Sequence, residues 1–135
     1  MIEMELNKIV IDEKRHDQLI VLKEKHGNRI LPIIIGLSEA SAIKLKISGF
    51  QPPRPLTHDL LYATIENLQA KLEKIVIDKL EANTFHAKLI LTQDGNSKTI
   101  DARPSDGIAL AIRANAPIFV EEAVIDKSDL FNKNI

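Results

Sequence analysis

The chain contains, from Asp101 to Arg113, the stretch DARPSDGIALAIR, in which charged residues directly precede a strongly apolar run. A proline followed by a serine is typical of the start of a helix, so we expect Ser105 to be the N-cap. Asp106 then falls in the first turn, where the positive end of the helix dipole favours a carboxylate. The apolar run after it predicts a helix buried between a sheet and a second layer or subunit.

A similar helix start lies upstream, in the stretch RPLTHDL from Arg54 to Leu60. It again places an arginine and a proline before a hydroxyl residue, Thr57, and an acid, Asp59, in the first turn. If the two helix starts meet in space, they form one acidic and basic site. Stabilisation of the helix dipole, worth about 0.3–1 kcal/mol, explains any single acid of this kind. It does not explain the density of charge from Asp101 to Asp106, which favours a site.

Composition limits the classes of protein to which the chain can belong. Its 135 residues, of which 44% are hydrophobic, are enough for one domain with its own core. The formal net charge of −1 provides no global field toward nucleic acid or an anionic membrane. The absence of cysteine excludes disulfides and thiolate chemistry. We expect a soluble cytoplasmic protein without membrane partners, because neither a leader pattern nor a stretch long enough to span a membrane is present.

Three short patterns recur in the two halves of the chain at separations of 66 to 68 residues. They are Ile-Val-Ile-Asp at 9–12 and 75–78, Gly-Asn at 27–28 and 95–96, and serine followed by an acid at 38–39 and 105–106. Because the three patterns keep one order and nearly one spacing, they indicate an ancient duplication.

Each half of the chain is predicted to contain three strands and then a helix, since segments rich in Ile, Val and Leu alternate with polar turns. The first half gives strands over 5–12, 18–23 and 29–35 and a helix over 38–48, and the second gives strands over 74–80, 84–92 and 98–103 and a helix over 105–115. We therefore expect an α+β fold in which the duplicated units form a mixed, largely antiparallel sheet, with about three helices in all.

The remaining segments connect and extend these units. A proline-rich loop over 49–55 precedes a helix that begins at Thr57. Apolar residues at helical spacing predict one buried face for this helix, made of Leu60, Leu61, Ile65, Leu68 and Leu72. A last strand over 117–125 would complete a single domain over 1–125, and we expect a frayed polar tail over 126–135.

Four ordered motifs resemble those of the bifunctional nuclease family. They are LPIIIG at 31–36, RPLTHDL at 54–60, TFHA at 84–87 and DARPSD at 101–106. The resemblance covers about residues 31–124, and it implies an α+β domain that cleaves both DNA and RNA. The chain departs from the family pattern at Gly107, where alanine is usual, and at His86, where tyrosine is frequent.

The two helix starts carry the groups that phosphodiester cleavage needs, which are a proton carrier, carboxylates and phosphate-binding cations. The candidate catalytic residues are His58, Asp59, Asp101 and Asp106, and the candidate substrate-binding residues are Arg54, Thr57, Arg103 and Ser105. The three aspartates are also candidate ligands for Mg²⁺ or Mn²⁺. With no Trp, one Tyr and four Phe, the chain offers few stacking surfaces, so we expect weak, salt-sensitive binding of nucleic acid.

A non-catalytic, homo-oligomeric binding or regulatory module is the alternative. The helix after Ser105 has more aliphatic side chains than one sheet face can cover, which predicts a homodimer or larger assembly. The charged residues at the helix starts would then form a lattice of ion pairs, and the domain would bind an anion or another protein.

Overall fold

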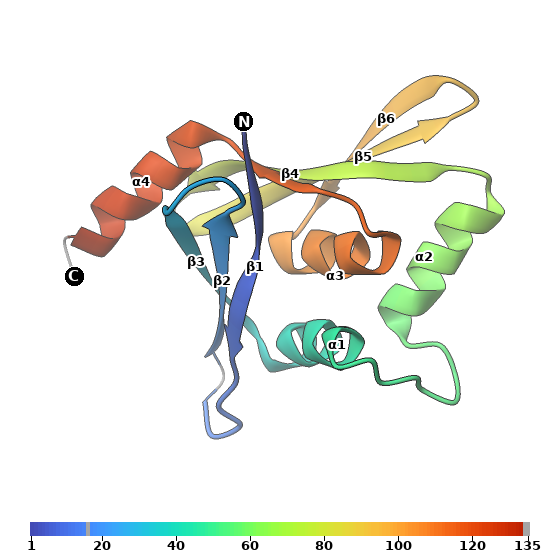
Figure 1. Cartoon of the computed structure of the whole chain (residues 1–135), viewed down its shortest axis with the longest axis horizontal. Coiled ribbons are helices and arrows are strands. Elements are labelled where there is room, and N and C mark those ends of the chain that lie inside the picture. Colours follow the sequence, from blue (N-terminus) through green and yellow to red (C-terminus); the bar gives the residue numbers. More distant parts are fainter. Residues whose placement is uncertain (16, 134–135) are drawn as a thin grey trace.

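The computed structural model describes residues 1–15 and 17–133, with side chains described through Leu130. The fold is α+β, as the sequence predicts (Figure 1). The elements in chain order are β1 (Ile2–Val10), β2 (Asp17–Glu24), β3 (Ile30–Gly36), α1 (Leu37–Ile47), α2 (Thr57–Asn67), β4 (Lys71–Glu81), β5 (Thr84–Gln93), β6 (Asn96–Ala102), α3 (Pro104–Ala114), β7 (Ile118–Val120) and α4 (Glu122–Lys133). None of these helices is long and apolar enough to cross a membrane.

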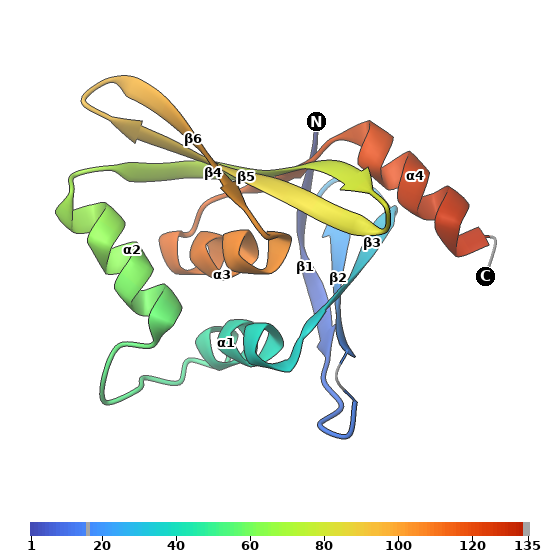
Figure 2. The same cartoon turned by 180° about the vertical axis from the view of Figure 1, so that it is seen from behind.

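The strands form one mixed sheet in the order β3-β2-β1-β7-β4-β5-β6. Strands β1 to β3 and strands β4 to β6 are two antiparallel meanders. The short strand β7 joins them, because it pairs antiparallel with β1 and parallel with β4. The sheet bends so that the two meanders stand at a steep angle, with α1, α2 and α3 inside the bend and α4 on the far side of β1 to β3 (Figures 1 and 2).

Each half of the chain contains an antiparallel meander followed by a helix, α1 in the first half and α3 in the second. This order is the one that a duplication requires. Whether the two units superpose stays a prediction.

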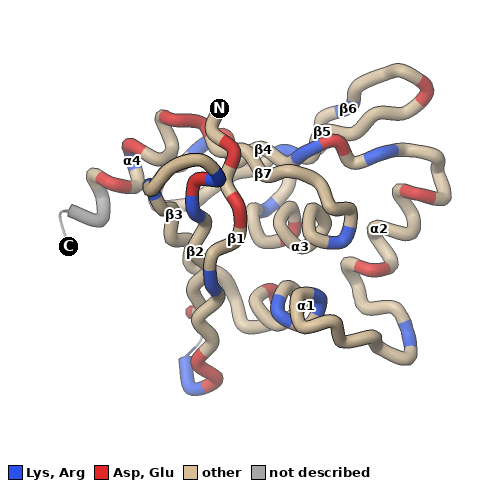
Figure 3. Tube along the Cα trace, viewed as in Figure 1, with Lys and Arg blue, Asp and Glu red and all other residues tan. Residues whose placement is uncertain are grey.

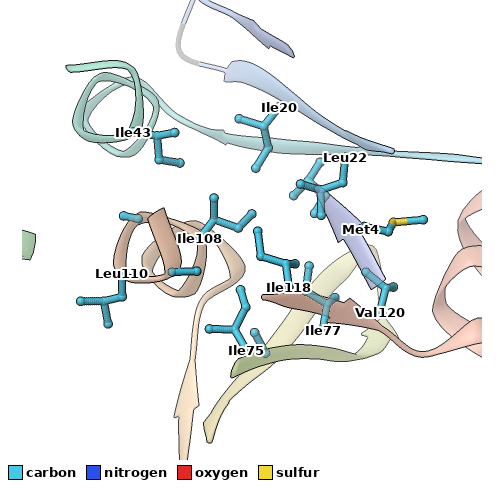
Figure 4. Close-up of a cluster of buried hydrophobic side chains, with 14 of the residues drawn as sticks. Met4, Ile20, Leu22, Ile43, Ile75, Ile77, Ile108, Leu110, Ile118 and Val120 are labelled. Carbon is cyan, nitrogen blue, oxygen red and sulfur yellow. The ribbon is translucent and has the colours of Figure 1, made fainter. Parts of the chain in front are cut away.

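Helix α3 is the centre of the core. Its residues Ile108, Ala109 and Leu110 are fully buried, and Figure 4 shows Ile108 between Ile43 of α1 and Ile118 of β7. An alanine Cβ at position 107 would lie 3.1 Å from Cδ1 of Ile75, so glycine allows α3 to approach β4 closely. The chain covers its own apolar helix. The inference that α3 needs a second subunit is therefore wrong, and the oligomeric state stays a prediction.

The helix starts lie one or two residues earlier than the hydroxyl residues that we expected as caps. Arg103 is the N-cap of α3, Leu56 is the N-cap of α2, and Gly36 is the N-cap of α1. In α3 the fixed φ of Pro104 suits the first helical position, which moves Ser105 inside the helix. Ser105 is the second residue of the helix and is only 5% exposed.

The C-terminal part of the chain differs from the prediction. Strand β7 ends at Val120, and the expected polar tail from Asp126 is instead helical through Lys133, as part of α4. The reason is a buried stripe at helical spacing, formed by Val124, Ile125 and Ser128. Residues 134 and 135 of the tail lie outside the described residues.

The prediction of one buried apolar face for α2 is mostly wrong. Ile65 is buried, but Leu60, Leu61 and Leu68 are exposed, and Leu72 belongs to β4. The helix ends at Asn67, and Gln69 then adopts a positive φ of 60°. Because α2 lies at the edge of the helical layer, only one narrow side of it contacts the core (Figure 1).

Candidate active site at the starts of three helices

The two helix starts meet, as the sequence predicts, through a contact between His58 of α2 and Asp106 of α3. Nε2 of His58 lies 2.8 Å from Oδ1 of Asp106, and the two side chains are 14% and 42% exposed. Since an ionised carboxylate can only accept, Nε2 is the donor in this contact, and in a neutral imidazole the lone pair then lies on Nδ1. The contact thus fixes the orientation of the imidazole ring.

The His58–Asp106 pair borders a hollow of about 420 Å³, which we call the dyad hollow. Its wall includes residues from the first turns of three helices: Ser38 and Glu39 of α1, Thr57 and His58 of α2, and Asp106 of α3. Unpaired backbone N–H groups at a helix start, and the positive end of the dipole, favour an anion. The three first-turn acids Glu39, Asp59 and Asp106 oppose that field.

Asp59, the neighbour of His58, makes a different contact with α3. Its Oδ1 accepts a hydrogen bond of 2.7 Å from Nε of Arg113, whose side chain is only 3% exposed. Nη1 of Arg113 also donates to the carbonyl oxygen of Ala109 at 2.9 Å. The backbone N–H of Leu56, followed by the guanidinium of Arg113, holds the pKa of Asp59 below its ordinary value. Asp59 is therefore part of a buried ion pair, rather than a free carboxylate.

Sequence reasoning missed Arg113, although a signal was present. Arg113 lies seven residues after Asp106, so both side chains fall on one face of α3. That face is the one that meets the first turn of α2, because both residues contact it.

Asp101 lies away from this site, on β6. Its side chain is 78% exposed, and Oδ1 accepts a hydrogen bond of 3.1 Å from Nζ of Lys88. This hydrogen bond lowers the pKa of Asp101 below its ordinary value. It also raises the pKa of Lys88 above its ordinary value. Lys88 also lies 3.6 Å from Oδ2 of Asp78. Asp101 therefore belongs to an exposed pair on the sheet.

The predicted substrate-binding residues are divided among three places. Thr57 lines the dyad hollow, and Arg103 and Ser105 line a larger groove on β3 and the β4–β5 turn. Arg54 is exposed in the loop before α2 and lines neither of these spaces. The structure thus gathers His58, Asp106 and Thr57, and it separates them from the two arginines.

A metal centre does not fit the residues present. Within residues 1–15 and 17–133, no three His, Asp or Glu side chains form a group that could hold a metal ion. The three predicted ligands instead contact three different groups, since Asp59 binds Arg113, Asp101 binds Lys88 and Asp106 binds His58. We therefore derive no step through a metal.

The fold and site define an α+β domain with a His–Asp pair at converging helix starts. The chain belongs to the bifunctional nuclease domain family, whose model matches residues 20–133. It is 45% identical, over 122 residues, to an uncharacterized protein of Mycobacterium tuberculosis (strain ATCC 25618 / H37Rv), covering 90% of this chain and 73% of that protein.

Plant relatives are more distant. Bifunctional nuclease 2 of Oryza sativa subsp. japonica is 29% identical over 118 residues, which are 84% of this chain and 36% of that protein. Bifunctional nuclease 1 of Arabidopsis thaliana is 24% identical over 114 residues, which are 82% of this chain and 35% of that protein. The chain thus spans about a third of the length of these two plant proteins.

Proposed function

We propose that the domain is a nuclease that hydrolyses phosphodiester bonds of DNA and RNA, with His58 and Asp106 as its reaction centre. The observation that carries this proposal is the 2.8 Å contact between the imidazole and the carboxylate beside a hollow at three helix starts. The family supports the same class of activity.

The pair has the chemistry that the reaction requires. Nε2–H of His58 keeps its proton and donates a hydrogen bond to Asp106, while Nδ1 takes a proton from a water molecule. The water oxygen forms a bond to phosphorus, and the bond between phosphorus and the leaving oxygen breaks. The leaving oxygen then takes up the proton from Nδ1, which regenerates neutral His58. The carboxylate of Asp106 stabilises the imidazolium while it is charged.

Binding of the nucleic acid chain is expected to be weak and sensitive to salt. Basic and acidic residues are interspersed along the chain, and Figure 3 shows no long stretch of one sign. Without a basic stripe, few phosphates are neutralised at once. The backbone N–H groups of the three helix starts are then the main attraction for the phosphate at the dyad hollow.

The test is cleavage of fluorescently labelled single-stranded RNA and DNA by the His58→Gln variant. Glutamine cannot take the proton, so we expect the rate to fall by about 10²-fold or more. The matched control is His26→Gln, because His26 is exposed in the turn between β2 and β3 and lines neither hollow. Equal rates for the two variants would refute the role of His58. Loss of cleavage in a chelator, restored by Mg²⁺, would refute the metal-free route.

A non-catalytic binding module is the second candidate. One observation favours it: His58 and Asp59 both contact α3, which is the lattice between helix starts that this reading requires. A wild-type protein that binds an anion at the dyad hollow but shows no cleavage in any buffer would favour the binding module over the nuclease. The homo-oligomer stays a prediction from the sequence, and light scattering is the measurement that tests it. The cytoplasmic location also stays a prediction.

A further inference from the structure

The larger groove, of about 840 Å³, lies next to the dyad hollow and is not used by the proposed reaction. We call it the β3 groove. Its walls are mainly apolar and include Pro32 and Ile34 of β3, Phe85 of β5 and Pro104 of α3. A volume of this size and a lining that is mostly apolar with a few polar groups are typical of small-molecule sites.

Ser105 supplies a largely buried hydroxyl group to the wall of this groove. Ser105 is 5% exposed and lines the groove from the first turn of α3. Among the described residues its Oγ makes no hydrogen bond, so the hydroxyl group is available to a ligand in the groove. A polar group in such a place needs water or a ligand to satisfy it.

The other polar groups define the chemistry of the ligand. Asn83, in the turn between β4 and β5, presents a carboxamide that both donates and accepts. The carboxylates of Asp17 and Glu39 line the groove together with the single guanidinium of Arg103, so acidic groups outnumber basic ones there and disfavour the head group of a fatty acid or another anionic lipid. A neutral, flat molecule with apolar faces and a hydrogen-bonding edge fits better. A nucleobase has this combination.

Two features connect the β3 groove with the dyad hollow. Glu39 lines both spaces, and the consecutive residues Ser105 and Asp106 line one each. A phosphate at the His58–Asp106 pair is thus next to the mouth of the groove. We propose that the β3 groove binds the base of a nucleotide adjacent to the cleaved phosphate, with Ser105 and Asn83 contacting the edge of the base. This inference rests on the proposed nuclease function for its biological meaning, but its binding step is independent of cleavage.

The test is titration of the full chain with adenosine and with uridine, followed by calorimetry or NMR, with free ribose as the ligand that lacks a base. Two variants remove the proposed contacts without strain. Ser105→Ala removes only the hydroxyl group, and Asn83→Gly keeps the positive φ of 64° that glycine adopts freely. The control is Ser97→Ala, because Ser97 is exposed on β6 and lines neither space.

We expect both nucleosides to bind to the wild type and ribose not to bind. Each groove variant should weaken nucleoside binding at least several-fold at an unchanged melting temperature, whereas Ser97→Ala should bind as the wild type does. Absence of nucleoside binding, or equal binding by the groove variants, would overturn the inference even if cleavage is present. Normal nucleoside binding in a wild type that cleaves nothing would instead sink the proposed function and leave the base site standing.

Discussion

His58 and Asp59 are neighbours in the first turn of α2, and both contact α3, but the two contacts differ in burial. The Asp59–Arg113 pair joins a side chain that is 28% exposed to one that is 3% exposed, near the end of α3. The His58–Asp106 pair lies at the start of α3 and opens onto the dyad hollow. We therefore propose that two similar contacts in one helical turn have different roles, the more buried pair in stability and the more exposed pair in activity.

The largest effect on stability is expected from Asp59→Ala. This change leaves the guanidinium of Arg113 buried without its carboxylate, and an unpaired buried charge costs about 3 kcal/mol or more. Urea denaturation should show a free energy of unfolding lowered by about that amount. A loss below about 1 kcal/mol, the value of an exposed pair, would remove the contrast between the two contacts.

Asp106→Asn is expected to separate activity from stability. Asparagine keeps an acceptor for Nε2–H of His58 but not the charge that stabilises imidazolium, so the cleavage rate should fall about tenfold or more. The melting temperature should move little, because a half-exposed first-turn carboxylate contributes at most about 1 kcal/mol. A variant that is clearly less stable yet cleaves at the wild-type rate would make this pair structural as well.

Acid should weaken the Asp59–Arg113 contact. The pKa of Asp59 is held below its ordinary value in the folded protein, so the contact stabilises the fold at pH values above the unfolded pKa of about 3.9. This stabilisation is lost as the pH falls through the lower, folded-state pKa. We expect wild-type stability to decline in that acidic range and the Asp59→Asn variant to show a flatter profile. Parallel profiles from thermal unfolding at several pH values would contradict the assignment.

The smallest effect is expected from Asp101→Asn. The carboxylate is 78% exposed and pairs with Lys88 at the surface of the sheet, where such pairs contribute below about 1 kcal/mol. Neither the free energy of unfolding nor the cleavage rate should change appreciably. A cleavage rate that falls as steeply as that of the Asp106→Asn variant would support Asp101 as a catalytic residue.

Prediction of the fold from sequence succeeded where the signal is local. Runs of Ile, Val and Leu between polar turns located the six strands of the two meanders to within a few residues. Pro104 located the start of α3, but the serine after it was taken for the cap, since a pattern does not distinguish the first helical position from the residue before it. The sequence did not predict helix α4, because most of its residues are polar and only Val124, Ile125 and Ser128 form its buried stripe.

The sequence by itself determined the fold class, the family and the two helix starts that carry the charged residues. Only the tertiary structure decided that His58 binds Asp106 across 48 residues and that Asp59 binds Arg113 across 54. The physical reason is the distance along the chain over which each kind of interaction acts. Propensities and caps act over a few residues, whereas the partner and the burial of a side chain depend on how α2 packs against α3, which the whole core sets.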